Sequence, residues 1–213
     1  MGAKGGPFNL ANQVFYIGIN DLFNDSQTNA PFNPVVFNIY DSWGGLAGDI
    51  VMQARAAVAR GQALFNTKPI VITGVSGIND EAAFGNPASV TGTCTTCHDT
   101  PNSGNHSVVA PLNLGLSDAS RRTPDMPLYT LRNRVTGETA QTTDPGRALI
   151  SGKWKHIGRF KGPILRGLAS RAPYFHNGFA ADLNAVVNFY QQRFNIVFSP
   201  QEKADLVAFL KAL

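Results

Sequence analysis

Apolar residues recur at helical spacing in the segment between about 48 and 66. The apolar positions are Ile50, Ala54, Ala57, Val58, Leu64 and Phe65, and the polar residues Arg55, Arg60 and Gln62 fall between them. This spacing predicts a helix from about Gly48 to Asn66. The small residue Gly61 lies within it, so we expect another helix to approach this segment closely.

Two further helices are predicted near the end of the chain, each with a start signal. Asp182 is a suitable N-cap for a helix from Leu183 to about Phe194, where Val186, Val187 and Tyr190 share one face. Ser199-Pro200-Gln201-Glu202 is a capping box with proline at the first helical position. It predicts a terminal helix whose apolar side carries Leu206, Phe209, Leu210 and Leu213.

Weaker patterns lie between these helices. Asp144-Pro145 resembles a capped helix start and predicts a short helix from Gly146 to Ser151. A strand is expected over 70–73, and a hairpin is expected from Tyr129 to Thr142 with its turn at Thr136-Gly137. The rest of 67–93 and of 99–143 is predicted to be irregular, because proline and glycine interrupt it repeatedly.

Residues 1 to about 46 show no helical or strand periodicity, yet they carry many rings. The aromatic residues are Phe8, Phe15, Tyr16, Phe23, Phe32, Phe37, Tyr40 and Trp43. A disordered tail is poor in aromatic residues, so we expect an extended arm that docks its rings onto a core or onto another domain. The sequence is therefore divided into an arm over 1–46 and a folded domain over 47–213.

Composition limits the function classes. Of the 213 residues 43% are hydrophobic, enough for a core, and only 15% are charged. The formal net charge of +4 favours an acidic protein partner, because no nucleic-acid-binding motif is present. No stretch is long and apolar enough to predict a membrane span. The chain holds two cysteines, and both belong to one motif.

That motif is Cys94-Thr95-Thr96-Cys97-His98, the attachment signature of a c-type haem. Each thiol adds to one vinyl group of the porphyrin, and the adjacent imidazole binds the iron as proximal ligand. Two alternatives share the Cys-x-x-Cys spacing: a redox dithiol, and a zinc site that would also need His98 and His106. The turn-like flanks Thr91-Gly92-Thr93 and Asp99-Thr100-Pro101 do not match the strand and helix that flank a thioredoxin-type pair.

Covalent attachment of haem in bacteria takes place outside the cytoplasmic membrane, so we expect a periplasmic or secreted protein. The chain begins Met1-Gly2-Ala3-Lys4 without an apolar signal core. We therefore expect that a signal has been removed or that the chain is a piece of a longer one.

A second motif resembles a known family. The segment Gly162-Pro163-Ile164-Leu165-Arg166 through Pro173-Tyr174-Phe175-His176-Asn177-Gly178 is similar to a signature of the bacterial di-haem cytochrome c peroxidases and the MauG group. The resemblance continues through Leu183 to Tyr190 and, with Ala63-Leu64-Phe65 and the CTTCH motif, covers about 48–213. It is closest to the C-terminal haem domain of that superfamily. It implies a mainly α, cytochrome c-like haem domain with long irregular loops and an extended N-terminal arm.

The resemblance also implies roles for single residues. Cys94 and Cys97 would hold the haem, His98 would bind the iron, and His176 would lie near the haem edge. The family places its distal ligand fourteen residues after the His176 position, where this chain has Tyr190. A phenolate ligand would stabilise ferric iron.

Alternatives to Tyr190 as distal ligand remain open. From its spacing alone, Tyr190 is equally a core aromatic on an apolar helix face. Met126 is the alternative distal ligand, on a loop 28 residues after His98. His106 is a further candidate for an axial or hydrogen-bonding role, whereas His156 is expected at the surface.

Basic residues accumulate without acids between Pro145 and Ala181. The cations are Arg147, Lys153, Lys155, Arg159, Lys161, Arg166 and Arg171. Lys161 or Arg166 is expected to contact the haem propionates, and others to dock an acidic redox partner or a second haem domain.

The cysteine count decides between functions. Di-haem peroxidases carry two such attachment motifs, whereas two cysteines allow this chain one haem c. The sequence therefore predicts a mono-haem electron-transfer domain. The alternative is half of a split or truncated di-haem peroxidase, or a MauG-like oxidoreductase reacting with peroxide. A third interpretation is a structural subunit of a larger haem assembly, with the aromatic arm as its contact.

Overall fold

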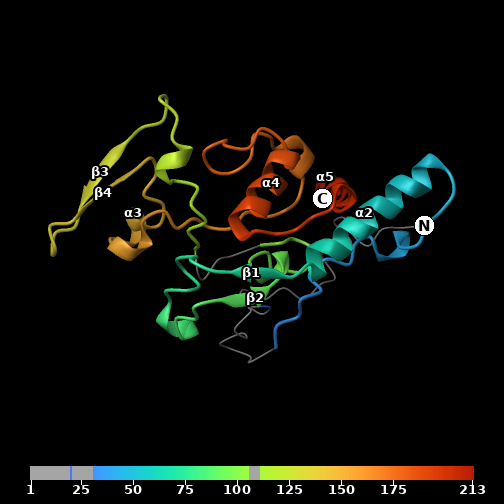
Figure 1. The fold of residues 1–213 in the computed structure, drawn as a ribbon, viewed down its shortest axis with the longest axis horizontal. Coiled ribbons are helices and arrows are strands. Elements are labelled where there is room, and N and C mark those ends of the chain that lie inside the picture. The colour runs from blue at the N-terminus through green and yellow to red at the C-terminus, as the bar shows by residue number, and fades with distance from the viewer. Residues whose placement is uncertain (1–19, 21–30, 106–110) are drawn as a thin grey trace. The chain divides into compact units, whose positions relative to one another are not determined.

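The computed structural model describes residues 20, 31–105 and 111–213, and Figure 1 traces the fold. The helices are α2 (Ile50–Thr67), α3 (Ala148–Ser151), α4 (Leu183–Phe194) and α5 (Pro200–Ala212). The strands are β1 (Ile70–Ile72), β2 (Val90–Gly92), β3 (Tyr129–Arg132) and β4 (Thr139–Thr142), which pair as β1–β2 and β3–β4. Single turns of 3-10 helix cover Asp41–Trp43, Ala82–Phe84, Cys94–Thr96, Ala119–Arg121, Trp154–His156 and Leu168–Ser170.

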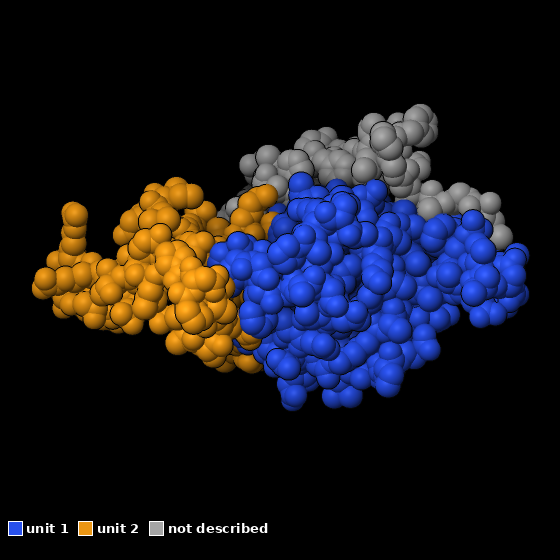
Figure 2. Space-filling model, turned by 90° about the horizontal axis from the view of Figure 1, so that it is seen from above, with its two compact units in different colours: residues 1–72, 91–108, 163–213 blue, residues 73–90, 109–162 orange. Residues whose placement is uncertain are grey.

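The chain divides into two compact units, which Figure 2 colours separately. Unit 1 comprises 1–72, 91–108 and 163–213, and unit 2 comprises 73–90 and 109–162. Unit 1 thus combines described residues of the predicted arm with α2, α4, α5 and the CTTCH motif. The units therefore have other bounds than the arm and domain that the sequence suggested.

The long helices of unit 1 begin where their capping residues predict. The Asp182 carboxylate accepts a hydrogen bond from the Ala185 N–H at 2.8 Å. Ser199 and Glu202 form the predicted capping box, with Pro200 as the first helical residue of α5. The helix predicted over 48–66 is α2, whose N-cap Asp49 accepts from the Met52 N–H at 2.9 Å.

At Gly61, α2 and α5 approach each other closely, as the sequence predicted. A β-carbon at Gly61 would lie 2.0 Å from the Asp205 carbonyl oxygen and 2.7 Å from Cβ of Phe209. Beside this contact, Arg60 of α2 holds the buried Asp205 carboxylate through two hydrogen bonds of 2.8 Å. In Figure 1, α2 runs across the view while α5 is seen nearly end on, so the two helices cross steeply.

Two buried amides of α2 hold the end of the arm. Asn66 accepts from the Phe37 N–H at 3.1 Å and donates to the Phe37 carbonyl at 2.7 Å. One turn earlier, Gln62 accepts from the Tyr40 N–H at 2.9 Å and donates to Asp41 at 2.8 Å. These contacts replace the strand or helix partners that an extended backbone lacks, and so explain why an irregular segment is buried.

The core of unit 1 forms around the rings that this segment contributes. Phe37 is fully buried, and its ring centroid lies 5.3 Å from those of Phe65 and Phe209. The buried members are Val36, Phe37, Ile39, Tyr40, Phe65, Leu165, Leu168, Leu183, Val187, Leu206, Val207, Phe209, Leu210 and Leu213. The predicted docking of the arm is confirmed for Phe37, Tyr40 and Trp43. Phe32 is half-buried and does not belong to this core. The other expected contacts, at Phe8, Phe15, Tyr16 and Phe23, lie outside the described residues.

Unit 2 contains the predicted hairpin. Strands β3 and β4 pair antiparallel, with Tyr129 opposite Thr142 and Arg132 opposite Thr139. The turn closes through the Gly137 N–H, which donates to the Asn133 carbonyl at 2.9 Å, and Gly137 has a φ of 77°. Glycine is favoured at such a position because its backbone adopts positive φ without strain.

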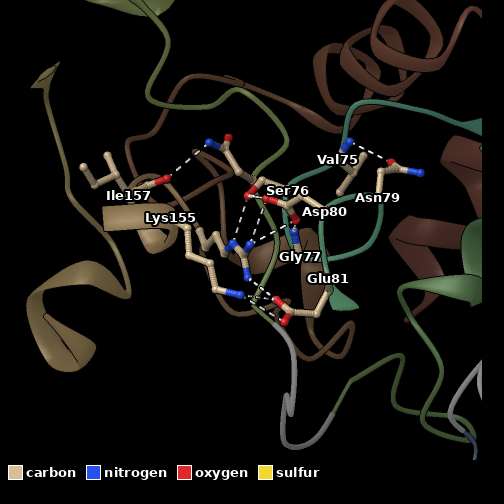
Figure 3. A network of polar contacts seen from close by, with 10 residues as sticks. Val75, Ser76, Gly77, Asn79, Asp80, Glu81, Lys155 and Ile157 are labelled. Carbon is tan, nitrogen blue, oxygen red and sulfur yellow. Dashed lines mark hydrogen bonds and ion pairs between the residues drawn. The ribbon is translucent and has the colours of Figure 1, made fainter. Parts of the chain in front are cut away.

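A buried guanidinium joins two acidic side chains within unit 2 (Figure 3). Arg159 is 3% exposed and contacts the carboxylates of Asp80 and Glu81 at 3.0 Å. Lys155 binds Glu81 as well, at 3.1 Å. Burial raises the pKa of the Asp80 carboxyl, but hydrogen bonds from Gly77 and Ser76 and the charge of Arg159 outweigh it, and the net pKa is lowered. Hydrogen bonds from Arg159 and Lys155 lower the pKa of Glu81.

We expect acid to loosen unit 2 through this network. Because the folded pKa of both carboxyls is depressed, their contribution is present above the ordinary carboxyl range and is lost as pH falls through the folded pKa. Removing the buried cation by Arg159→Leu should cost about 3 kcal/mol at pH 7 and flatten the pH dependence. Hydrogen exchange of peptides from 73–90 and 109–162, at pH 7 and pH 4, measures both effects.

The control for this experiment is Lys153→Gln, which removes an exposed cation of the same unit. It should leave exchange unchanged at both pH values. Equal exchange in Arg159→Leu and the parent protein at pH 7 would contradict the assigned role.

Two local predictions were wrong. The Asp144 carboxylate accepts from the Gly146 N–H at 2.7 Å, and Gly146 has a φ of 58°, which no right-handed helix allows, so α3 starts at Ala148. His156 is buried, with Nδ1 2.8 Å from the Ser151 hydroxyl; burial and the nearby cations, led by Arg159, lower its pKa. In α2 itself, Ile50 and Ala54 are exposed, whereas the polar residues Gln62 and Asn66 are buried.

Among the described residues, no helix combines the length and apolar character needed to cross a membrane.

Candidate functional site

The CTTCH motif folds as one tight turn that begins at Cys94. The N–H groups of Cys97 and His98 both donate to the Cys94 carbonyl, at 3.3 and 3.1 Å. The two threonines between the cysteines are buried, and Thr95 is fully so. The turn therefore directs its threonines into the protein and keeps both cysteines on a single loop of backbone, as attachment to one porphyrin requires.

Residues before the motif fix the start of this turn. Thr93 is its N-cap, and the Thr93 N–H donates to the Thr96 hydroxyl at 2.9 Å. A β-carbon at Gly92 would lie 2.1 Å from the same hydroxyl oxygen, so only glycine leaves room for Thr96. The flank Thr91-Gly92-Thr93, which the sequence marked as turn-like, in fact contains the end of strand β2.

His98 is a half-buried imidazole that contacts two aromatic rings. Its ring centroid lies 5.9 Å from that of Phe65 in α2 and 6.5 Å from that of Tyr190 in α4. Burial lowers the pKa of His98 to about 4, so the ring is neutral at pH 7. Its Nδ1 is buried and has no hydrogen-bond partner among the described residues. A neutral imidazole is the form that binds a metal ion.

Both cysteines are free and protonated at neutral pH. Burial raises the pKa of Cys94 and of Cys97 to about 12 in each case. A redox dithiol needs a thiolate at neutral pH, whereas addition to a haem vinyl group starts from the thiol. In 31–105 and 111–213, no three His, Cys, Asp or Glu side chains gather to hold a metal ion. His106, which the zinc alternative requires, lies outside the described residues.

Tyr190 of α4 is the second aromatic residue whose ring contacts His98. The planes of Tyr190 and His98 are inclined at 75°. Burial raises the pKa of the Tyr190 phenol, and the neighbouring Cys97 and Cys94 raise it further. Its ring also contacts Phe189 at 5.2 Å and Phe175 at 6.2 Å. The structure thus brings His98, both cysteines and Tyr190 into one neighbourhood of unit 1.

The loop after His98 is tied to two other segments of unit 1. Asn102 donates to the Asn38 side chain at 2.9 Å and accepts from the Asn38 N–H at 3.1 Å. The Ser103 carbonyl accepts from the Leu165 N–H at 2.8 Å. Sequence reasoning missed Asn38 and Asn102, because an asparagine pair 64 residues apart leaves no local signal.

The other sequence candidates are more dispersed. Arg166 lies in unit 1, where its charge acts on the pKa of Tyr40 and its buried Nη1 has no acceptor among the described residues. His176 is an exposed residue of the same unit. Lys161 is exposed in unit 2, which also holds Met126 in a turn closed by the Thr123 carbonyl. Their expected roles at a haem stay predictions.

Two curated proteins are similar to this chain over more than half of its length. The IdrP2 cytochrome-c peroxidase of Denitromonas iodatirespirans is 32% identical over 57% of this chain, and the IdrP1 cytochrome-c peroxidase of Pseudomonas sp. (strain SCT) is 29% identical over 56%. The chain is related to cytochrome-c peroxidases. It spans 36% of the length of each of these curated relatives. No family model and no solved structure matches it.

The residues at the site fit a covalently bound haem. The cysteines lie on one turn as protonated thiols, and the following imidazole is neutral and lacks a partner at Nδ1. A satisfied core histidine would hydrogen-bond that nitrogen. The relatives agree with the predicted resemblance to the peroxidases, while the assignment to a C-terminal haem domain stays a prediction.

Proposed function

We propose that this chain is a c-type cytochrome domain that binds one haem and transfers electrons. Cys94 and Cys97 would hold the haem and His98 would bind its iron. The observation that carries the proposal is the CTTCH turn, which sets two protonated thiols beside a half-buried, neutral imidazole. A bound haem supplies one-electron chemistry, because its iron alternates between ferric and ferrous states.

We propose a cytochrome c-like fold for unit 1. Two helices cross at Gly61, and the first of them carries Phe65 in its last turn, where the Phe65 ring contacts His98. The two packed helices would thus present an apolar surface beside the proposed iron ligand. An apolar surface of this kind excludes water and lowers the polarity around the iron, and this is one way in which a protein tunes the reduction potential of its haem.

We infer that Tyr190 is the second ligand to the iron. Its ring is the aromatic neighbour of His98 on α4, in the same apolar surroundings. A cation beside a buried phenol favours its ionised form, and a phenolate stabilises ferric iron. Met126 is kept as the alternative ligand.

A second candidate function is peroxide reduction by a protein of which this chain is one part. The names of the relatives favour it, since they are cytochrome-c peroxidases nearly three times as long as the matched segment. In that case this domain would relay electrons to a second haem, or would itself react with peroxide at an open iron site.

Electron paramagnetic resonance and optical spectra of the ferric holoprotein separate the two functions. Electron transfer predicts a six-coordinate iron whose spectrum is unchanged by added peroxide. An open, high-spin iron that reacts rapidly with peroxide would contradict the first proposal and support the second.

The ligand is tested by Tyr190→Phe and Met126→Ala. Tyr190→Phe is expected to change the ferric spectrum and to raise the reduction potential, because a ligand that favours ferric iron is lost. Met126→Ala should leave both unchanged. Tyr129→Phe, the same change at an exposed tyrosine of unit 2, is the control. The reverse pattern would assign the ligand to Met126.

We propose an acidic redox protein as partner and the periplasm as location. On unit 2, Leu149 and Ile150 of α3 are 73% and 90% exposed, next to the exposed Lys153. An apolar centre with basic neighbours suits a transient complex with an acidic surface. Electron transfer to an acidic cytochrome should slow with rising salt and further in Lys153→Glu; salt-independent transfer would contradict this partner.

A further inference from the structure

Phe175 has a backbone conformation that bulky residues rarely adopt. Its φ is 67°, in the left-handed region, where the β-carbon of an ordinary residue is crowded. Such strain persists when the surrounding structure determines it, and it concentrates at functional sites. The residue lies between Tyr174 and His176 in the motif that the sequence singled out, and no role was assigned to it there.

The surrounding loop holds this conformation from both sides. The Tyr174 N–H donates to the Ala180 carbonyl at 2.7 Å, and the Tyr174 hydroxyl donates to the Leu168 carbonyl at 2.7 Å. Inside the closed loop, the Gly178 N–H donates to the Phe175 carbonyl at 3.3 Å. Phe175 is therefore the first residue of a short loop whose two ends, Tyr174 and Ala180, are bonded to each other, with Tyr174 bonded also to Leu168.

The ring of Phe175 lies against α4. Its centroid is 4.8 Å from that of Phe189, in an edge-to-face contact, and 6.2 Å from that of Tyr190. The other aromatic neighbours of Tyr190 on α4 are Phe189 and Phe194, one and four residues away on the same helix. Within 31–105 and 111–213, only Phe175 and His98 bring rings to Tyr190 from outside α4.

We propose that Phe175 is a positioning residue for Tyr190. Phe189 and Phe194 share the backbone of Tyr190 and move with it, so they do not set the direction of the phenol relative to His98. A ring from a separately anchored loop can fix the direction of the Tyr190 phenol. The left-handed backbone at Phe175 places its ring against Tyr190. The inference rests on the proposed role of Tyr190 as an iron ligand.

The test uses the ferric holoprotein with Phe175→Leu and Phe175→Gly. The first keeps an apolar side chain without the ring, and the second removes the ring while suiting the left-handed backbone. The measured quantity is the part of the optical and paramagnetic spectrum that Tyr190→Phe abolishes. We expect both variants to weaken this signal by about two- to tenfold, the range that corresponds to one aromatic contact, and Phe175→Tyr to retain it.

The matched control is Phe179→Leu, whose ring contacts Phe189 at 6.5 Å from the same loop. It should keep the full signal, and urea unfolding of all variants separates positioning from general loss of stability. A full signal in both Phe175→Leu and Phe175→Gly would overturn the inference while leaving Tyr190 as ligand. If Tyr190→Phe itself leaves the spectrum unchanged, the proposed ligand and this inference fall together.

Discussion

Replacing Cys94 and Cys97 together by alanine should yield a chain without covalently bound haem. Both thioether bonds are lost, and no other cysteine exists to replace them. Each single variant should retain one bond and give a lower yield with a shifted absorption band. Haem staining after denaturing electrophoresis, on protein made in a host that matures c-type cytochromes, measures the result.

The control for the cysteine variants is Thr91→Ala, an exposed change three residues before the motif. It should bind haem as the parent chain does. Covalent haem in the double variant at the level of the parent would contradict attachment at this motif.

Replacing Gly61 should destabilise unit 1 although glycine is a poor helix former. Alanine at an exposed helical position is favoured by about 1 kcal/mol over glycine. At Gly61 the added carbon would lie 2.0 Å from a backbone carbonyl oxygen of α5, so the helices must separate. We expect Gly61→Ala to lose about 2 kcal/mol and Gly61→Val about 3 kcal/mol or more, measured by urea unfolding.

The control for Gly61 uses the exposed face of the same helix. Ala63→Gly should destabilise the protein by about 1 kcal/mol, through helix propensity alone. If Gly61 did not contact α5, Gly61→Ala would by the same propensity stabilise the protein by about 1 kcal/mol. A stabilised Gly61→Ala protein would show that α2 and α5 do not meet as described.

Features encoded by neighbouring residues were predictable from the sequence. The caps at Asp182 and Ser199 act within four residues, so α4 and α5 begin where expected. The apolar side predicted for α5 is buried at Leu206, Phe209 and Leu210, as the helical spacing of these residues indicates. The tight turn at CTTCH likewise is held by its own residues together with the adjacent Gly92 and Thr93.

Features that depend on distant partners were not predictable. Gln62 and Asn66 are polar residues whose burial makes sense only once Phe37 and Tyr40 lie against them. Asp144 is a residue type that often caps helices, but Gly146 adopts a positive φ, and the next N–H, that of Arg147, donates to the Arg159 carbonyl. Local propensity was overridden by tertiary contacts in both cases.

The candidate site was predictable only in part. The proposed iron ligand His98 and the cysteines follow from spacing, whereas Tyr190 came from a resemblance, and its contact with His98 is a finding of the structure. The φ of Phe175 has no local signature, since phenylalanine gives no preference for it. Only the closed loop around it accounts for that conformation.

The central claim is that the turn from Cys94 to His98 binds one haem covalently. The intact mass of the denatured protein, purified from a host that attaches haem c, tests it most directly. The account predicts the mass of the chain plus one haem, with the absorption of a two-thioether haem. A chain of unmodified mass from such a host, or haem that is extracted by acidified solvent, would contradict it.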